Sequence, residues 1–119
     1  MFAPCALGGG INDQTLPELN CLIVAGASNN QLLDEKLHGA QLRERGIRYC
    51  PDYAINAGGL IHVAAEHAGQ SVESVQGRIE GIGDTIRLIL ERATLEGLSE
   101  REIADRIVEE RLDAAGNRA

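Results

Sequence analysis

Three short apolar runs alternate with helical stretches in the first half of the chain, and this alternation constrains the fold most. The expected strands are Met1–Cys5, Cys21–Ala25 and Ile47–Cys50. The expected helices are residues 12–19, residues 33–45 and a third that ends near His67. The second of these places Leu33, Leu37 and Ala40 on one face. This order is typical of a parallel sheet with right-handed crossovers. The sequence therefore predicts an α/β fold with three parallel strands.

The remaining segment, residues 71–119, has a different pattern. Its apolar residues are spaced by three and four, which predicts one long amphipathic helix along Val72, Val75, Ile79, Ile82, Ile86, Ile89 and Ala93. Gly97 is expected to end this helix. Ser99 and Glu102 form a capping-box pattern that opens a final helix. Its expected inward side chains are Ile103, Ile107 and Leu112.

Charge and composition narrow the classes of partner. The formal net charge is −7, the sequence pI about 4.9 and the aromatic content 3%. An acidic chain with few aromatic residues is unsuited to nucleic acids and anionic membranes. We see no signal peptide and no apolar run of about 18 residues, so a cytoplasmic protein without a membrane span is expected. The cysteines Cys5, Cys21 and Cys50 form no CxxC pair, and we expect buried free thiols in a reducing compartment.

Neutral amides follow the expected strands, where ligands bind in open α/β sheets. Asn29 and Asn30 come directly after the second strand, and Asn56 follows the third. An amide both donates and accepts, so it holds another amide or a carboxylate without adding charge. Asparagine also caps turns and helices, and the pattern alone leaves both interpretations open.

Other candidate motifs favour structural interpretations. Gly8-Gly9-Gly10 lacks the GK[ST] of a phosphate loop, and no GxGxxG occurs, so the sequence contains no visible pyrophosphate site. The glycines at 77, 81 and 83 interrupt the long helical pattern, which favours helix packing. His62, Glu66 and His67 have crude metal-ligand spacing without a fourth candidate, and we expect no metal.

Three segments together carry a resemblance to a known family. They are "FAPCALGGGIND" at 2–13, "VAGASNNQL" at 24–32 and "YCPDYAINAGGLIHVAAE" at 49–66. In this order they resemble the glutamate/leucine/phenylalanine/valine dehydrogenases, and most of all the leucine dehydrogenases of that family. Members usually have "GSANN" where this chain has Gly26-Ala27-Ser28-Asn29-Asn30. The resemblance covers nearly the whole chain, but only the carboxyl-terminal part of the family's cofactor-binding domain.

The resemblance implies oxidative deamination of an amino acid, with hydride passed to NAD, although NADP stays open. It implies that the Cys5–Ala6 turn lies beside the nicotinamide ring. It implies that Asn29 and Asn56 hold the nicotinamide carboxamide and steer the substrate. Leu60 and Val63 match positions that line the substrate side-chain pocket, and in glutamate-specific relatives the position of Val63 is a serine. An aliphatic substrate such as leucine is therefore expected.

The resemblance also implies a division of the chain. Residues 1–70 correspond to the second half of a Rossmann-type domain and residues 71–119 to the C-terminal helices. The family's catalytic lysine and aspartate have no counterpart, since the only lysine, Lys36, lies in an expected surface helix. We therefore expect no catalytic residue here, no turnover by this chain alone, and a homo-oligomeric full-length enzyme. The alternative is a non-catalytic binding or complementation module derived from the same family.

Overall fold

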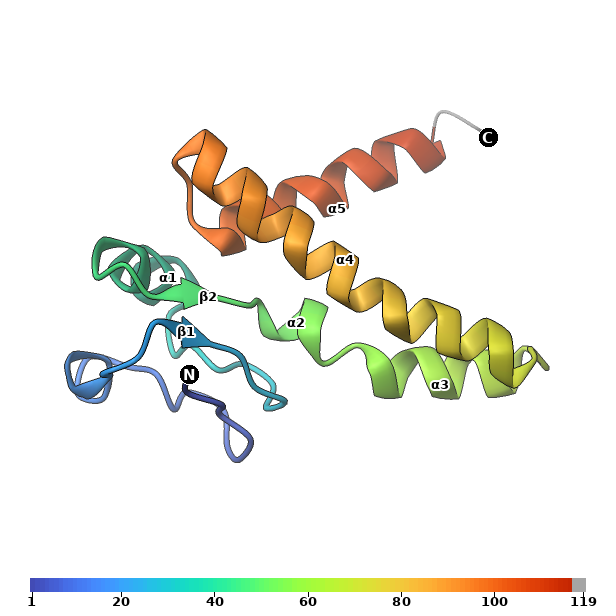
Figure 1. Ribbon diagram of the computed structural model, residues 1–119, viewed down its shortest axis with the longest axis horizontal. Coiled ribbons are helices and arrows are strands. Elements are labelled where there is room, and N and C mark those ends of the chain that lie inside the picture. Colours follow the sequence, from blue (N-terminus) through green and yellow to red (C-terminus); the bar gives the residue numbers. More distant parts are fainter. Residues whose placement is uncertain (117–119) are drawn as a thin grey trace.

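A small parallel sheet lies at one end of an elongated, mostly helical protein. The computed structural model describes residues 1–116, so the last three positions of the expected C-terminal helical segment lie outside the described residues. Strands β1 (Ile23–Val24) and β2 (Arg48–Tyr49) pair in parallel, with Ile23 opposite Arg48 and Val24 opposite Tyr49. Figure 1 shows the strands and the N-terminus grouped together, while α4 runs diagonally from the far end of the molecule toward the side of the sheet. The α/β class is confirmed, with two regular strands.

The expected first strand is reduced to a single bridge, so a three-stranded sheet is not confirmed. Phe2 pairs in parallel with Val24. Its N–H donates to Ile23 O at 2.9 Å, and its carbonyl accepts from Ala25 N–H at 3.0 Å. The next bond of this ladder would need an N–H at Pro4, which proline lacks. The Pro4 carbonyl instead accepts from Ser28 N–H at 3.0 Å, and regular pairing stops there.

The segment before β1 forms only a short helical turn, whereas the segment between β1 and β2 forms a regular helix. The expected helix at 12–19 is only a 3-10 turn, η1 (Leu16–Glu18), which has Pro17 in its first turn. Helix α1 (Glu35–Glu44) forms as predicted, because Asp34 caps it by accepting from Leu37 N–H and Gly46 follows it at φ 69°. The face with Leu33, Leu37 and Ala40 is exposed, whereas the buried face carries His38, Gly39 and Leu42.

Four helices follow β2. They are α2 (Asp52–Ile55), α3 (Gly58–His67), α4 (Val72–Glu96) and α5 (Glu100–Gly116). The Gly97 end of α4 is confirmed, with φ 70°. The capping box is also confirmed, since Ser99 N–H donates to Glu102 Oε2 at 3.0 Å and Glu102 N–H donates to Ser99 Oγ at 3.3 Å.

The long apolar stripe of α4 is only partly buried. Val75, Ile89 and Ala93 are buried, whereas Val72 is 78% exposed. The expectation that Leu112 faces inward is wrong, because its side chain is 66% exposed. Figure 1 shows α5 diverging from α4 toward its C-terminal end, which removes the surface against which Leu112 would pack.

Two apolar clusters form the core. One surrounds the sheet and contains Ile11, Leu16, Val24, Leu32, Leu42, Ile47 and Tyr49. The other joins α4 to α5 and contains Ile89, Ala93, Ile103, Ala104 and Ile107. Arg48 of β2 connects them, since its Nε lies 2.8 Å from Glu100 Oε1 and its Nη2 donates to Leu90 O at 2.6 Å. Across residues 1–116, no helix is long and apolar enough to cross a membrane.

Candidate functional site

A hollow of about 590 Å³ lies beyond the carboxyl ends of the two parallel strands. It is lined by Asn29, Asn30, Asp52, Tyr53, Asn56, Ala57 and Leu60. The loop after β1 supplies the first two of these residues, and α2 with the start of α3 supplies the others. This is the position at which ligands bind in open α/β sheets. The hollow unites three of the residues proposed from the sequence, namely Asn29, Asn56 and Leu60.

The two predicted asparagines are directly paired. Asn56 Nδ2 donates to Asn29 Oδ1 at 2.5 Å, and the pair is exposed to solvent. This bond uses the oxygen of Asn29 and one N–H of Asn56. The two N–H groups of Asn29 and the Oδ1 of Asn56 keep their capacity for other partners. The pair therefore presents donors and an acceptor side by side at the end of the sheet.

Asp52 fixes the loop that carries Asn29. One carboxylate oxygen accepts from Asn30 N–H at 2.6 Å, and the other accepts from the Tyr49 hydroxyl at 3.1 Å. Asn30 has φ 50°, a left-handed conformation that asparagine tolerates better than most residues. Burial of the Tyr49 phenol, together with the nearby Asp52 charge, raises the pKa of Tyr49, so this hydroxyl stays a donor. Asp52 is thus a positioning residue for the asparagine pair.

The prediction from sequence did not assign a role to Asp52. Its position in the sequence could have indicated such a role, because Asp52 directly follows Pro51 at the strand end and precedes Asn56 by four residues. Residues spaced by four share a helix face, and Asn56 N–H does donate to Asp52 O at 2.9 Å. Asp52 is 7% exposed, and a buried carboxylate at such a place needs partners that only the tertiary structure reveals.

The turn before Asn29 is packed too closely for any side chain at Gly26. A Cβ atom there would lie 2.2 Å from Pro4 O. Ser28 Oγ donates to the same carbonyl at 3.0 Å, and Gln31 Nε2 donates to Gly26 O at 2.8 Å and to Ser28 O at 3.0 Å. Hydrogen bonds from both sides therefore hold the small-residue turn in one conformation.

The other proposed site residues lie outside the lining of this hollow. Cys5 and Ala6 are exposed in the loop after Pro4, and Val63 is 62% exposed on α3, one helical turn beyond Leu60. The expectation of three buried thiols is wrong for Cys5, which is exposed, although Cys50 is buried and all three thiols are free. Burial raises the pKa of the Cys50 thiol, and Glu100 adds to the effect.

The weaker motifs lie apart from the strand-end hollow. His62 and Glu66 line a small hollow beside Val75, and residues 1–116 contain no group of three His, Cys, Asp or Glu side chains arranged to hold a metal ion. Gly77, Gly81 and Gly83 lie inside helix α4, in regular helical structure rather than in a phosphate-binding loop.

The fold is an α/β fold with an amide-lined hollow at the strand ends, the position at which open α/β sheets bind ligands. The family model described as Glutamate/Leucine/Phenylalanine/Valine dehydrogenase matches residues 1–110. The chain therefore belongs to this family of oxidoreductases.

Similar proteins extend well beyond the length of this chain. Leucine dehydrogenase of Thermoactinomyces intermedius is 50% identical over 113 residues, which are 95% of this chain and 31% of that protein. Phenylalanine dehydrogenase of Bacillus thermotolerans is 48% identical over 118 residues, again 31% of its length. The crystal structure of L-tryptophan dehydrogenase from Nostoc punctiforme superposes with a TM-score of 0.93 at 45% identity, covering 98% of this chain and 35% of that one. The chain thus spans about a third of these relatives.

Proposed function

We propose that this chain is the nicotinamide-side part of an amino-acid dehydrogenase, and that it positions NAD while another part of the enzyme supplies the acid–base groups. The observation that carries the proposal is the Asn29–Asn56 pair at the strand ends. Membership of the dehydrogenase family supports it. In this assignment residues 1–70 form the second half of a Rossmann-type domain, and residues 71–119 form its C-terminal helices.

The asparagine pair fits the carboxamide of a nicotinamide. A carboxamide needs a donor for its oxygen and an acceptor for its amino group. Asn29 Nδ2 supplies the donor and Asn56 Oδ1 the acceptor, because the bond between the two side chains uses neither atom. When bound, the cofactor supplies the hydride-accepting chemistry. The two asparagines would fix the ring orientation without adding a charge, and the Cys5–Ala6 turn, which lies outside the lining of the hollow, would contribute a further contact to the ring.

The proposed substrate is an amino acid with an apolar side chain, and an aliphatic one such as leucine fits best. Leu60 and Val63 lie one turn apart on α3, so their side chains share a face of that helix. A glutamate carboxylate would lose its hydration against these two residues. The named activities of the relatives, on leucine, phenylalanine and tryptophan, all concern amino acids with apolar side chains.

The direct test is a chimera in which this chain replaces the matching segment of the Thermoactinomyces intermedius leucine dehydrogenase. The chimera should oxidise leucine with NAD and reject glutamate. The isolated chain should show no turnover, because its only lysine, Lys36, is exposed on α1. A folded chimera without leucine oxidation would contradict the proposal, as would leucine oxidation by the isolated chain.

The choice of substrate has its own test in the same chimera. Val63→Ser should lower kcat/KM for leucine about tenfold, since an apolar pocket contact of this size is worth roughly this factor. Val72→Ser is the matched control, because Val72 is 78% exposed at the start of α4. If the two substitutions lowered kcat/KM equally, Val63 would not line the substrate pocket. We further propose that the complete enzyme is a cytoplasmic homo-oligomer, which sedimentation of the chimera would test.

A further inference from the structure

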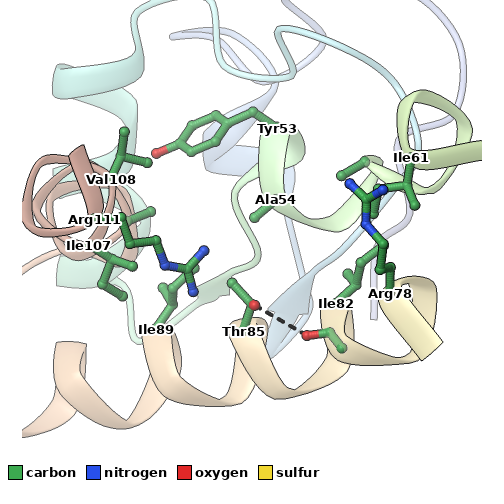
Figure 2. Close-up of a pocket in the computed structure, with 13 residues that line it drawn as sticks. Tyr53, Ala54, Ile61, Arg78, Ile82, Thr85, Ile89, Ile107, Val108 and Arg111 are labelled. Carbon is green, nitrogen blue, oxygen red and sulfur yellow. Dashed lines mark hydrogen bonds between the residues drawn. The ribbon is translucent and has the colours of Figure 1, made fainter. Parts of the chain in front are cut away.

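A second cavity lies between helices α2, α3, α4 and α5, and its lining differs in chemistry from that of the strand-end hollow. Its volume is about 370 Å³, within the range of small-molecule sites. Residues of α2 and α3 form one wall, α4 forms the floor and α5 forms the opposite wall (Figure 2). Most of its lining is apolar, from Ala54, Ala57, Ile61, Ile82, Ile89, Ala104, Ile107 and Val108. Only Tyr53 and Ala57 line both cavities.

Among residues 1–116, two arginines are the only charged residues of this lining. Arg78 comes from α4 and Arg111 from α5. In Figure 2, Arg111 reaches from α5 toward Thr85, and Arg78 rises beside Ile61. Within residues 1–116, neither guanidinium has a carboxylate at ion-pair distance, and Arg78 has only a 3.2 Å hydrogen bond to Gln70 Oε1.

The lack of carboxylate partners at this cavity contrasts with the rest of the helical region. The arginines of α4 and α5 outside the cavity are paired with carboxylates, namely Arg87, Arg92, Arg101 and Arg106. The chain has 18 acidic residues and a net charge of −7, so acidic partners are plentiful. The cavity is mostly apolar, and its charged side chains are cationic and lack acidic partners. It is therefore complementary to an anion that carries an apolar chain.

We propose that this cavity binds a small carboxylate with an aliphatic chain. The chain would lie on the isoleucine and alanine side chains, where its burial is favourable. The carboxylate would meet the guanidinium of Arg111 or Arg78, whose fork of N–H groups matches a carboxylate bidentately. The two arginines exclude a cation, and the apolar lining offers few partners to a highly polar phosphate ester. This proposal is independent of the dehydrogenase assignment.

Octanoate is the probe, titrated calorimetrically into the 119-residue chain, with octan-1-ol as its uncharged analogue. We expect saturable binding of one octanoate per chain and at least tenfold weaker binding of the alcohol. Absence of saturable octanoate binding, many molecules bound per chain, or equal binding of the alcohol would each overturn the proposal.

A glycine pair in α4 provides a variant and a matched control. Gly81 lines the cavity, whereas Gly83 does not, and a Cβ atom at either would meet no atom within 4 Å. Gly81→Leu should fill the cavity and weaken octanoate binding at least tenfold, while Gly83→Leu should leave binding unchanged. Both substitutions replace glycine inside a helix and should raise the melting temperature. Loss of binding would therefore not reflect unfolding. Equal octanoate affinities in the two variants would contradict the assigned site.

The arginines supply the second pair of variants. Arg111→Gln or Arg78→Gln should weaken octanoate binding roughly tenfold, the order expected for a lost charge-assisted contact. Arg87→Gln is the control, because Arg87 lies on the same helix as Arg78 but pairs with Asp84 at 2.7 Å and is absent from the cavity lining. If neither cavity substitution weakens binding more than the control does, the anion is not held by these guanidinium groups and the proposal fails.

Discussion

The side-chain amide of Asn56 donates to Oδ1 of Asn29 at 2.5 Å, although 27 residues separate them in the chain. Each asparagine follows a different strand, and the parallel pairing of β1 with β2 brings the two strand ends together. Asp52 then holds the backbone of Asn30 in place. The sheet register and one buried carboxylate therefore bring the two amides together.

The asparagine pair should matter for cofactor use and little for stability. In the leucine dehydrogenase chimera, Asn29→Ala removes the proposed donor to the carboxamide, so kcat/KM for NAD should fall about tenfold. The melting temperature should hardly change, because the pair is exposed. Asn20→Ala is the control at an exposed asparagine outside the hollow. A large fall in melting temperature with unchanged kinetics would instead make Asn29 a structural residue.

Gly26 should tolerate no side chain. In Gly26→Ala the new methyl group would lie 2.2 Å from the Pro4 carbonyl, so the Pro4 segment or the turn must move. We expect a loss of roughly 1–3 kcal/mol in the free energy of unfolding, the usual cost of overpacking. Urea unfolding would measure it. Gly59→Ala is the control, because its Cβ would meet no atom within 4 Å. Equal stability of the two variants would contradict the tight contact.

The capping box of α5 should contribute measurably to stability. Ser99→Ala removes the hydroxyl that accepts from Glu102 N–H, and about 1 kcal/mol is expected for the loss of such a cap. Hydrogen bonds from Ser99 lower the pKa of Glu102. A lowered carboxyl pKa contributes stability above its unfolded value of about 4.3, which is lost as the pH falls.

Thermal melts between neutral and acidic pH would test the cap. The stability difference between the wild type and Ser99→Ala should be largest near neutral pH and should shrink in acid. Ser74→Ala, at an exposed serine in the first turn of α4, is the control and should leave the stability almost unchanged at every pH. A difference that does not change with pH would show that Ser99 acts without the Glu102 charge.

Alkaline pH should weaken the fold through its tyrosines. Burial, followed by the charge of Asp52, raises the pKa of Tyr49 above the unfolded value of about 10. The folded state then holds the phenolic proton more tightly, so its stabilising effect is complete below about pH 10 and is lost as the pH rises further. Burial also raises the pKa of Tyr53, whose hydroxyl donates to Asp105 Oδ1 at 3.0 Å.

A spectroscopic titration would isolate this effect, because the chain has two tyrosines and no tryptophan. The ultraviolet absorbance of tyrosinate from the buried Tyr49 should appear only together with unfolding, whereas Tyr53, which is 42% exposed, can ionise earlier. Tyr49→Phe should reduce the loss of stability above pH 10 relative to the wild type, at the cost of the hydrogen bond to Asp52. Ionisation of both tyrosines near pH 10 in a protein that stays folded would contradict the buried Tyr49–Asp52 contact.

Local signals in the sequence were sufficient for helices α1 and α4 and for the cap of α5. They were not sufficient for residues 12–19, which form only the turn η1, or for α2, which the sequence did not predict. Gly46 and Gly97 adopt the left-handed conformation expected after a helix, and Ser99 caps α5 through a residue three positions away. Interactions of this kind are complete within a few residues, so no distant partner alters them. The strand-end position of the asparagines also followed from the order of the elements.

Burial depended on partners that lie far away in the sequence. Leu37 and Leu112 satisfy a helical apolar pattern and are nevertheless exposed. His38, in contrast, is buried, and both ring nitrogens have partners: Nδ1 accepts from Asp34 N–H, and Nε2 lies 3.2 Å from Asp13 Oδ1. The first apolar run forms one bridge because Pro4 cannot donate.

The sequence alone thus determined the ends of α1 and α4, the cap of α5 and which residue types follow each strand, since those features depend on neighbours along the chain. Only the tertiary structure decided that Asn29 meets Asn56, that Asp52 supports them, and that Arg78 and Arg111 line one cavity. The two hydrogen bonds join residues that are 27 and 22 positions apart, and the two arginines are 33 positions apart. Over such separations the sequence pattern fixes neither distance nor orientation.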